Sequence, residues 1–302
     1  MAVTNKWAKK TADNGRVDLH CHTTASDGMF APAEIVRKGQ AAGLSAIAIT
    51  DHDTVAGVAE AAEEGERLGI TVVPGIEIST YAEGADIHVL GYFTANDNEL
   101  WQERLSSLRG VRGNRNVLIV EKLRSLGIAI AWSDVEGIAN ERRPADGTKG
   151  KSIGRPHIAE ALIRKGVVAT MGEAFDRYLA PGAAAYVEMP KVHPVEALRW
   201  IKEAGGAGVI AHPGLYGRDA LVKELIAAGA DGIEVYHPDH DAESEQRYLE
   251  LAHLHGILST GGSDYHGERN GESYHGAIGS RYAPRDTIRA LLDKILQRNG
   301  TL

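Results

Sequence analysis

Residues 17–28 read VDLHCHTTASDG, and this stretch opens with a short apolar run that ends in two histidines. Residues two apart on a β-strand point to the same face, so His20 and His22 can present both imidazole rings to one metal ion. A lone His-x-His pair arises easily by chance. The interpretation of these two residues as metal ligands therefore depends on the rest of the chain.

Short apolar runs alternate with amphipathic stretches along most of the sequence, which is typical of parallel β/α units. The predicted strands are Val17–His20, Ala46–Thr50, Thr71–Val73, Asp86–Gly91, Gly208–Ala211, Gly232–Tyr236 and Ile257–Thr260. The predicted helices are Pro32–Ala42, Val55–Leu68, Pro194–Ala204, Arg218–Ala228, Ala242–His255 and Arg285–Arg298. The pattern predicts an α/β fold, a distorted (β/α)7 barrel similar to a TIM barrel, with its active site at the C-terminal ends of the strands.

The β/α alternation stops between about Asp97 and Val187, where helical segments follow one another without a clear strand. These predicted helices are Leu100–Leu126, Ser133–Ile138, Arg155–Lys165 and Gly172–Tyr178. We therefore predict a barrel domain made of residues 1–96 and 188–302, with a small helical domain inserted at 97–187. We expect the inserted helices to form a lid or wall over the mouth of the barrel.

The composition narrows the possible functions. With 302 residues, 43% hydrophobic and 25% charged, the chain can bury an ordinary globular core. A net charge of −8 argues against duplex DNA as a partner. We find no window close to the roughly 18 uncharged apolar residues of a membrane helix and no signal-peptide core, so we expect a cytoplasmic protein without a membrane partner. The single cysteine, Cys21, agrees with a reducing compartment.

Potential metal ligands recur where the predicted strands end. These residues are His20, His22, His52, Glu77, His88, His212, Asp264 and His266. The carboxyl ends of barrel strands meet at one mouth, so side chains from distant parts of the sequence are expected to face a common point there. Unrelated core or surface histidines would have to occupy all these positions independently.

The same stretches carry a family resemblance. In chain order, VDLHCHTTASDG, AIAITDHDTVAG, VVPGIEIS, HVLGY, AHP and GGSDYHG resemble the motifs of the PHP (polymerase and histidinol phosphatase) family of metal-dependent phosphoesterases. The resemblance covers about residues 1–95 and 190–302. Within the predicted helical insert, SIGRPHIAEALIRKGVV resembles one branch, the bacterial 3′,5′-nucleoside bisphosphate phosphatases that also act as 5′→3′ exoribonucleases.

Carried over residue by residue, the resemblance implies a site for three divalent metal ions. The implied ligands are His20, His22, Glu77 and Asp264 for one ion, Glu77, His88 and His212 for a second, and Asp27, His52 and His266 for a third. Glu77 would bridge the first two ions. Mixed imidazole and carboxylate ligands suit Mn²⁺, Zn²⁺ or Fe²⁺ better than Mg²⁺ or Ca²⁺.

The resemblance also implies an activity, the hydrolysis of phosphate esters by a hydroxide that bridges the metal ions. The expected substrate is a nucleoside 3′,5′-bisphosphate that loses its 3′-phosphate, or the 5′ end of a short single-stranded RNA. Glu77, Asp264 and His237 are the residues expected to be catalytic. Three alternatives stay open: a histidinol-phosphate phosphatase of the same family, an amidohydrolase barrel, and a metal-dependent nucleotide-binding module without turnover.

Several residues outside the implied ligand set are candidates for substrate binding. Arg155 stands before Pro156 at a predicted helix start, where free N–H groups and a guanidinium together suit a phosphate. His157 and Lys151 are weaker candidates nearby. His237 follows a predicted strand, so we expect it at the barrel mouth, as a substrate contact or proton donor, and His275 is a similar candidate.

Two further expectations concern supporting residues. Arg109, Arg112 and Arg115 are spaced three apart on a predicted helix, and such a stripe ordinarily forms an exposed face. Asp51 precedes His52, and we expect it to orient a ligand histidine from behind the metal ions.

Overall fold

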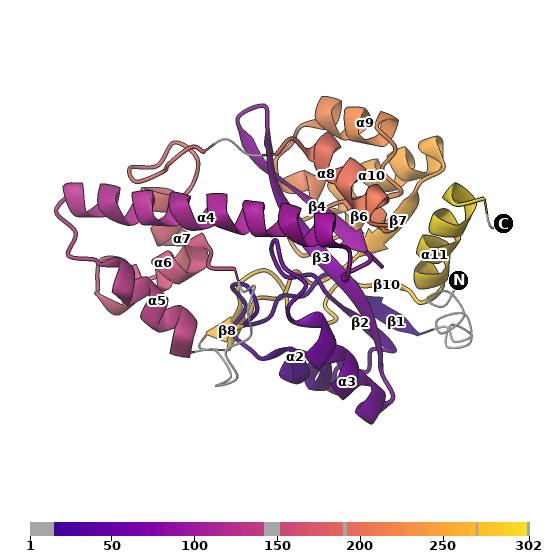
Figure 1. Cartoon of the computed structure of the whole chain (residues 1–302), viewed down its shortest axis with the longest axis horizontal. Coiled ribbons are helices and arrows are strands. Elements are labelled where there is room, and N and C mark those ends of the chain that lie inside the picture. Colours follow the sequence, from indigo (N-terminus) through magenta and orange to yellow (C-terminus); the bar gives the residue numbers. More distant parts are fainter. Residues whose placement is uncertain (1–14, 142–151, 190–191, 270, 301–302) are drawn as a thin grey trace.

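The computed structural model describes residues 15–141, 152–189, 192–269 and 271–300. Within these ranges, eight strands form one sheet that curls into a nearly closed barrel (Figure 1), in the order β10-β1-β2-β3-β4-β5-β6-β7. The strands are β1 (Arg16–Asp18), β2 (Ala46–Ile49), β3 (Thr71–Ala82), β4 (Ala85–Tyr92), β5 (Ala207–Ile210), β6 (Gly232–Tyr236), β7 (Leu258–Gly261) and β10 (Ala283–Pro284). Two short strands, β8 (Glu268–Arg269) and β9 (Glu272–Ser273), pair separately. The predicted α/β barrel is confirmed.

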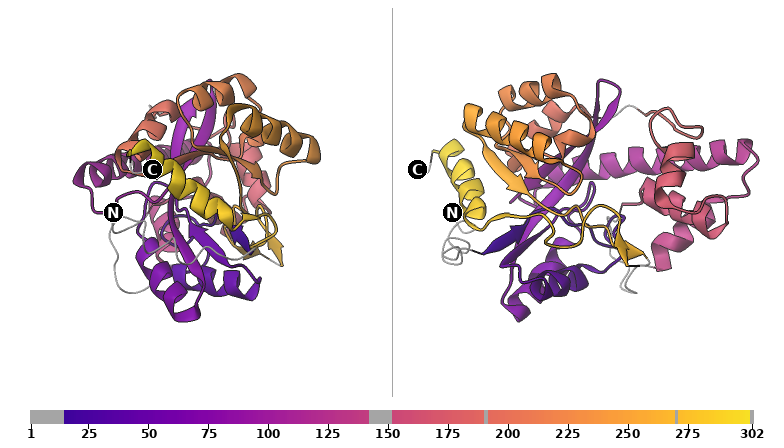
Figure 2. Two further views of the ribbon diagram at one scale, coloured as in Figure 1. Left: turned by 90° about the vertical axis from the view of Figure 1, so that its right-hand side faces the viewer. Right: turned by 180° about the vertical axis from the view of Figure 1, so that it is seen from behind.

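The helices fall into two groups. The first consists of α2 (Pro32–Ala41), α3 (Val58–Leu68), α8 (Pro194–Glu203), α9 (Asp219–Ala227), α10 (Ala242–His255) and α11 (Asp286–Arg298), with the 3-10 helix η2 (Pro213–Leu215). The second lies between β4 and α8 and consists of α4 (Glu99–Ser125), α5 (Trp132–Glu141), α6 (Arg155–Arg164), α7 (Met171–Ala174) and the π-helix η1 (Phe175–Leu179). Figure 2 shows α11 and the pair α5 and α6 at opposite ends of the molecule. In the described part of the chain, none of the helices combines the length and apolar character needed to span a membrane.

The barrel closes where the segments after β1 and β7 meet. The N–H of Leu19 donates to the carbonyl of Gly261 at 3.1 Å, and the N–H of His22 donates to the carbonyl of Tyr265 at 2.9 Å. These bonds join the first and last parts of the sheet. They also place the His20–His22 stretch beside Asp264, which lies more than 240 residues away in the sequence.

Strands β3 and β4 depart from the predicted parallel pattern. β3 continues past the predicted end at Val73 to Ala82, and it pairs with β4 in the antiparallel direction from Gly75 onward. Glu83 and Gly84 between them both have positive φ, 50° and 82°. A two-residue turn of this kind joins antiparallel strands and is too short for a parallel crossover. β4 consequently runs antiparallel to β5 as well.

The long helix α4 contributes to two hydrophobic clusters. Near its start, Trp101 and Leu105 are buried with residues of β3, β4 and α8. Near its end, Ile119 and Leu123 are buried with residues of α5, α6 and η1. Figure 1 shows α4 running from the barrel to the second helix group. The second group thus has a hydrophobic cluster separate from the barrel, while the division into domains at 97 and 187 remains a prediction.

Trp101 provides a test of the contact between α4 and the barrel. Its side chain is 1% exposed, whereas the neighbouring Leu100 is 52% exposed. We expect Trp101→Ala to lower the free energy of unfolding by about 3–5 kcal/mol, because a large buried side chain leaves a cavity when truncated. Leu100→Ala is the matched control and should change it by less than about 0.5 kcal/mol. Urea denaturation measures both; equal effects would contradict the packing described.

Candidate functional site

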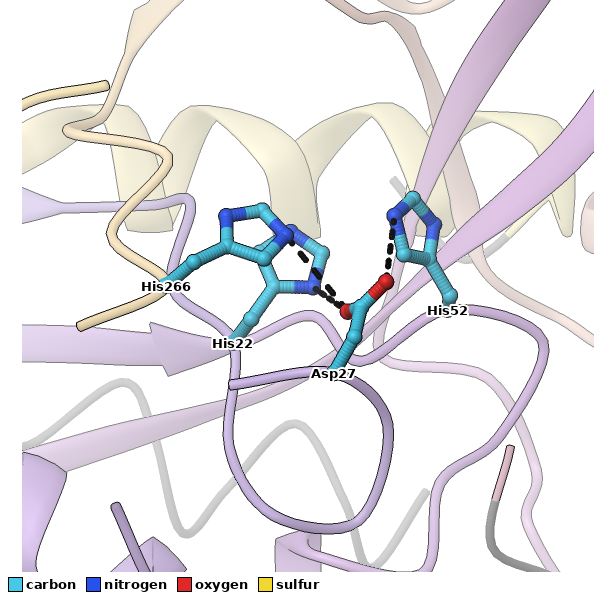
Figure 3. A group of neighbouring side chains, drawn as sticks. All are labelled: His22, Asp27, His52 and His266. Atoms are coloured by element: carbon cyan, nitrogen blue, oxygen red, sulfur yellow. Dashed lines mark ion pairs between the residues drawn. The ribbon is translucent and has the colours of Figure 1, made fainter. Parts of the chain in front are cut away.

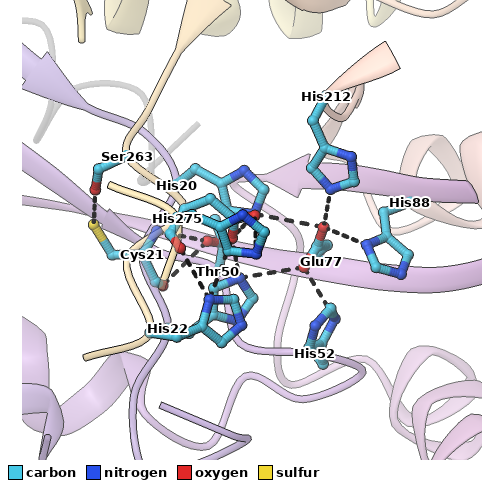
Figure 4. A network of polar contacts seen from close by, with 12 residues as sticks. His20, Cys21, His22, Thr50, His52, Glu77, His88, His212, Ser263 and His275 are labelled. Carbon is cyan, nitrogen blue, oxygen red and sulfur yellow. Dashed lines mark hydrogen bonds and ion pairs between the residues drawn. The ribbon is translucent and has the colours of Figure 1, made fainter. Parts of the chain in front are cut away.

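The carboxylate of Glu77 lies buried at the barrel mouth among imidazole rings (Figure 4). Its two oxygens lie 3.5 Å from His20, 3.3 Å from His22, 2.9 Å from His52, 2.8 Å from His88 and 3.1 Å from His212. The structure thus brings together six of the predicted site residues. Glu77 and His88 lie within β3 and β4 rather than at strand ends as predicted, because β3 continues through Glu77 and into the hairpin.

Asp264 completes a second group on the other side of the paired histidines. Its Oδ1 lies 3.3 Å from Nε2 of His20 and 3.1 Å from Nε2 of His22. Asp264 has a φ of 50°, a backbone conformation that is uncommon outside glycine and tends to occur at functional sites. The donor atoms of His20, His22, Glu77 and Asp264 are close enough together to hold one metal ion.

A third group gathers around Asp27 (Figure 3). Its oxygens lie 3.8 Å from Nδ1 of His22, 3.8 Å from Nε2 of His52 and 3.5 Å from Nε2 of His266. These four residues also form a group able to hold a metal ion. His88 and His212 both approach Oε1 of Glu77, so the histidines implied for a further ion face the same carboxylate oxygen.

Asp51 supports the loop that carries Asp27. It accepts hydrogen bonds from the backbone N–H of Thr23 at 2.8 Å, the Thr23 hydroxyl at 2.7 Å and the Ser26 hydroxyl at 2.6 Å. These hydrogen bonds of Asp51 thus go to the loop, and its action on a ligand histidine is the charge interaction with His22, so the expected orienting role stays a prediction. A carboxylate behind a short polar loop satisfies the buried donors of that loop, and this is the contact that the structure shows.

The polar atoms of these groups fit bound cations. Several donor atoms are buried without a hydrogen-bond partner, namely Nε2 of His20, both ring nitrogens of His22, Oδ1 of Asp27, Nδ1 of His52, Oε2 of Glu77, Nδ1 of His88 and Oδ1 of Asp264. Buried polar atoms are normally paired, so a cluster of unpaired ones points to a group that binds there. Imidazole nitrogens and carboxylate oxygens are ligands for Mn²⁺, Zn²⁺ and Fe²⁺.

The pKa shifts at the cluster agree with a cation site. Burial by itself would raise the pKa of Glu77, but His88, His52 and His20 lower it well below its usual range. Asp264 has its pKa lowered well below its usual range in the same way, chiefly by His20. Burial opposes the protonated form of His22, but hydrogen bonds to Asp264 and Glu77 raise its pKa to about 10. Divalent ions that replace such protons would satisfy the same carboxylates.

Glu234 supports the cluster from behind and was not among the predicted site residues. Its carboxylate accepts from Nδ1 of His20 at 3.0 Å and from the backbone N–H of His212 at 2.9 Å. A hydrogen on Nδ1 of His20 leaves the lone pair on Nε2, which faces Glu77 and Asp264. One feature of the sequence could have revealed Glu234: it is a glutamate inside the apolar run GIEVY, where a charged side chain needs a buried partner.

His237 and His275 both reach the outer oxygen of Asp264. Nε2 of His237 lies 3.3 Å from Oδ2, and Nε2 of His275 lies 3.5 Å from the same atom. Nδ1 of His237 accepts from the backbone N–H of Asp239, so in the neutral ring Nε2 carries the hydrogen and donates to Asp264. Nδ1 of His275 lies 2.6 Å from Oδ2 of Asp239. The roles of both histidines toward substrate remain predictions.

Arg112 and Arg115 contradict the expected exposed face of α4. Arg115 is 4% exposed, and the Arg112 side chain is 10% exposed. The stripe faces the barrel mouth because α4 crosses over it. Both arginines line a cavity of about 250 Å³ together with Arg155, Glu77 and His266. A row of polar residues along a helix predicts a solvent-exposed face only when the helix does not pack over a polar site.

The arginines differ in their partners. Arg112 donates to Oδ2 of Asp53 at 3.1 Å and to the hydroxyl of Ser79 at 3.0 Å. Arg155 donates to Oδ2 of Asp86 at 2.7 Å and to the carbonyl of Leu179 at 3.1 Å. The predicted position of Arg155 at a helix start agrees with α6, which begins at this residue.

The remaining predicted residues have less defined roles. His157 is 2% exposed, and its Nδ1 accepts from the backbone N–H of Gly154 at 3.1 Å, which caps the start of α6. Binding of substrate by His157 stays a prediction. Lys151 lies outside the described residues.

The sequence of this chain is similar to those of known proteins. The PHP domain model matches residues 18–140. The chain is 34% identical over 256 residues to a 5′-3′ exoribonuclease of Haemophilus influenzae, covering 83% of this chain and 90% of that protein. The chain belongs to the PHP family. This PHP protein is also 33% identical over 261 residues to a 3′,5′-nucleoside bisphosphate phosphatase of Chromobacterium violaceum, covering 84% and 88% of the two chains.

A solved structure gives the same assignment. A protein of Bifidobacterium adolescentis named as a metal-dependent phosphoesterase matches with a TM-score of 0.83 and 35% identity, over 92% of this chain and 96% of that one. The PHP resemblance is therefore confirmed. The PHP protein is a metal-dependent phosphoric ester hydrolase.

Glu234 contacts the ligand histidine His20 but is not itself an implied metal ligand, so a substitution there tests how the cluster is held in place. Glu234→Gln keeps the size of the side chain but removes the charge that faces Nδ1 of His20. We expect metal affinity to fall by about 10–100-fold, the usual cost of losing such a partner. Glu224→Gln, on the exposed face of α9, is the control and should bind metal as wild type does. Titration with Mn²⁺ measures both, and equal affinities would contradict the role of Glu234.

Proposed function

We propose that this PHP protein removes the 3′-phosphate of nucleoside 3′,5′-bisphosphates and cleaves the first linkage of short single-stranded RNA by the same displacement. The observation that carries the proposal is the cavity that Arg112, Arg115 and Arg155 line together with residues of the carboxylate–imidazole cluster. One side of this cavity suits a reacting phosphate, and the other suits a second, non-reacting phosphate. Two relatives described above are named for substrates of this kind, a 5′-3′ exoribonuclease and a 3′,5′-nucleoside bisphosphate phosphatase.

We propose further that three divalent ions, Mn²⁺, Zn²⁺ or Fe²⁺, occupy the cluster. The ligand sets are His20, His22, Glu77 and Asp264; Glu77, His88 and His212; and Asp27, His52 and His266. When bound, such ions polarise the phosphoryl oxygens and lower the pKa of a coordinated water. The chain's contribution is to hold nine donor side chains from separate strands at one point, which fixes the position of the reacting phosphate.

Arg115 is the strongest sign of a second phosphate. Burial and the neighbouring charges of Arg155 and Arg112 lower the pKa of Arg115 to about 9. Its Nε has no hydrogen-bond partner, and its terminal nitrogen donates to the side chain of Asn116 at 3.3 Å. A buried guanidinium among like charges is costly without a counter-ion, and a phosphate would supply both the charge and the acceptors.

The walls of the cavity suit a nucleoside between the two phosphates. Phe175 and Tyr274 line it with ring centroids 6.4 Å apart, and the Arg155 guanidinium lies 5.7 Å from the centre of the Phe175 ring. Aromatic rings stack on any base, so we expect weak preference among bases. Phe175 begins the π-helix η1, whose Leu179 carbonyl holds Arg155, and this supports a role for the second helix group as a wall of the site.

The rival activities make different use of this cavity. Histidinol phosphate has one phosphate and no nucleobase. Because it lacks a second phosphate, it would place no anion beside the arginines. A nucleotide-binding module would retain the same contacts but release no phosphate. The metal-dependent hydrolase class favours turnover over binding alone.

A substrate panel tests the proposal directly. We expect the protein to release phosphate from adenosine 3′,5′-bisphosphate faster than from histidinol phosphate in parallel assays with Mn²⁺, Zn²⁺ and Mg²⁺. Glu77→Gln should abolish most of this release, because it removes the shared carboxylate of the cluster. Glu224→Gln serves as the control for the same chemical change. Release at equal rates by wild type and Glu77→Gln would refute the mechanism, and binding without release would support the nucleotide-binding module.

Arg115→Met separates recognition from stability. The variant keeps a long apolar stem but removes a buried charge whose neighbouring carboxylates, Asp86 and Asp53, are paired with other arginines. We expect unchanged or higher thermal stability, since replacing such a charge by an apolar side chain is often stabilising. We also expect KM for adenosine 3′,5′-bisphosphate to rise by roughly 10–100-fold, from the loss of charged hydrogen bonds of about 1.5–3 kcal/mol. Release from p-nitrophenyl phosphate should change little; equal losses on both esters would remove the assigned role.

A further inference from the structure

A second cavity of about 440 Å³ adjoins the metal cluster on the side of Asp27 and His266. Its lining comes from the loops after β1 and β7, from the start of α6, and from α7 with the two residues before it. It shares Asp27, Pro156, His266 and Tyr274 with the arginine-lined cavity. Among the described residues, its lining includes none of the three arginines. The reacting phosphate position therefore lies between two spaces with different chemistry.

The chemistry of the second cavity suits an uncharged, partly aromatic group. Met29, Pro156, Met171 and Tyr274 supply apolar and aromatic surface, and the ring of Tyr274 is 42% exposed. No lysine or arginine occurs among the described lining residues. A volume of this size lies in the usual range of about 300–1,000 Å³ for ligand pockets.

Apart from Asp27 of the cluster, the two carboxylates of this cavity are already engaged. Glu160 accepts from Nε of Arg164 at 2.9 Å, and Glu268 accepts from the hydroxyl of Tyr265 at 2.9 Å. In the described part of the lining, no lysine or arginine is available to hold a further phosphate. The cavity is thus suited to a nucleoside and not to a long run of phosphates.

We propose that the second cavity binds the nucleoside that follows the reacting phosphate of a short oligonucleotide with a 5′-phosphate. This inference rests on the proposed function. The 5′-phosphate would lie at the arginines, the first nucleoside against Phe175, the linking phosphodiester at the cluster, and the second nucleoside in the cavity beyond Asp27 and His266. A nucleoside 3′,5′-bisphosphate would fill only the first part of this path.

One displacement serves both substrates. Water adds its oxygen to phosphorus and the bond from phosphorus to the 3′-oxygen breaks, so the 3′-oxygen leaves with a proton as a hydroxyl. With a bisphosphate the other product is inorganic phosphate. With a dinucleotide the phosphate stays on the 5′-oxygen of the second nucleoside, which is then itself a 5′-phosphorylated nucleotide. The second cavity is needed for the dinucleotide alone.

Filling the cavity tests the inference. Gly172 lines it and is exposed, and a Cβ added there meets only the Thr170 hydroxyl, at 3.9 Å. We would compare Gly172→Trp with Gly172→Ala, and add Ala169→Trp as a second filling variant. Gly110→Trp is the matched control for an added indole, because Gly110 is exposed on α4 and a Cβ there meets nothing within 4 Å.

The manganese-loaded enzyme is assayed on a 5′-phosphorylated dinucleotide and on adenosine 3′,5′-bisphosphate. We expect both filling variants to lower kcat/KM for the dinucleotide by roughly tenfold or more, since base stacking contributes about that much per base. The rate on the bisphosphate should stay within about twofold, a change too small to report a lost contact. Gly172→Ala and Gly110→Trp should behave as wild type on both substrates.

Binding gives a second readout that does not depend on turnover. A dinucleotide with 2-aminopurine as its second base and a hydrolysis-resistant phosphorothioate linkage should lose fluorescence when its base packs against Tyr274. Gly172→Trp should weaken this binding, while Gly110→Trp should not.

Three results would overturn the inference while leaving the proposed function intact. They are an unchanged dinucleotide rate in both filling variants, equal losses on both substrates, and unchanged binding of the 2-aminopurine dinucleotide by Gly172→Trp. A wild-type enzyme that hydrolyses the bisphosphate but not the dinucleotide would refute the inference together with the RNA cleavage included in the proposed function. A wild-type enzyme that hydrolyses neither substrate would instead refute the proposed function itself.

Discussion

The structure depends on one buried carboxylate, that of Glu77, which is 1% exposed and faces five histidines. A charge in this position is stable only when cations or protonated groups surround it. The barrel provides that environment by ending or crossing strands from all parts of the chain at the same point. Glu234 and Asp51, both buried, then hold in place the histidines and the loop that complete the cluster.

Two kinds of charge meet across a single cavity. The cluster is rich in carboxylates and unpaired imidazole nitrogens, and the same cavity is also lined by Arg112, Arg115 and Arg155. Without cations, the carboxylates of the cluster hold protons on nearby histidines, as the raised pKa of His22 shows. The carboxylates of Asp86 and Asp53 act on Arg115 as counter-charges, but they are paired with Arg155 and Arg112. A phosphate ester bound through metal ions would therefore bring cations to the carboxylates and an anion to the arginines.

The barrel and the convergence of its ligands could be predicted because apolar runs and strand-end histidines are local features of the sequence. The antiparallel course of β4 was missed because it depends on the left-handed backbone of Glu83 and Gly84, which a glutamate seldom adopts. The burial of Arg112 and Arg115 was missed because helix periodicity shows that two residues share a face but not what covers it. Glu234 was visible as a charge in an apolar strand, but its partners lie more than 200 residues away in the case of His20.

Helix α4 fixes the position of Arg112 and Arg115 relative to the barrel. Its first turns are packed against the barrel, its last turns belong to the second hydrophobic cluster, and its arginines lie on the span between these anchors. A helix held at both ends bends little, so the separation between arginines and metal cluster is set by rigid backbone. Under the proposed function, this separation would set the interval between the two phosphates of the substrate. A shift in the register of α4 would then change which bisphosphates fit the cavity.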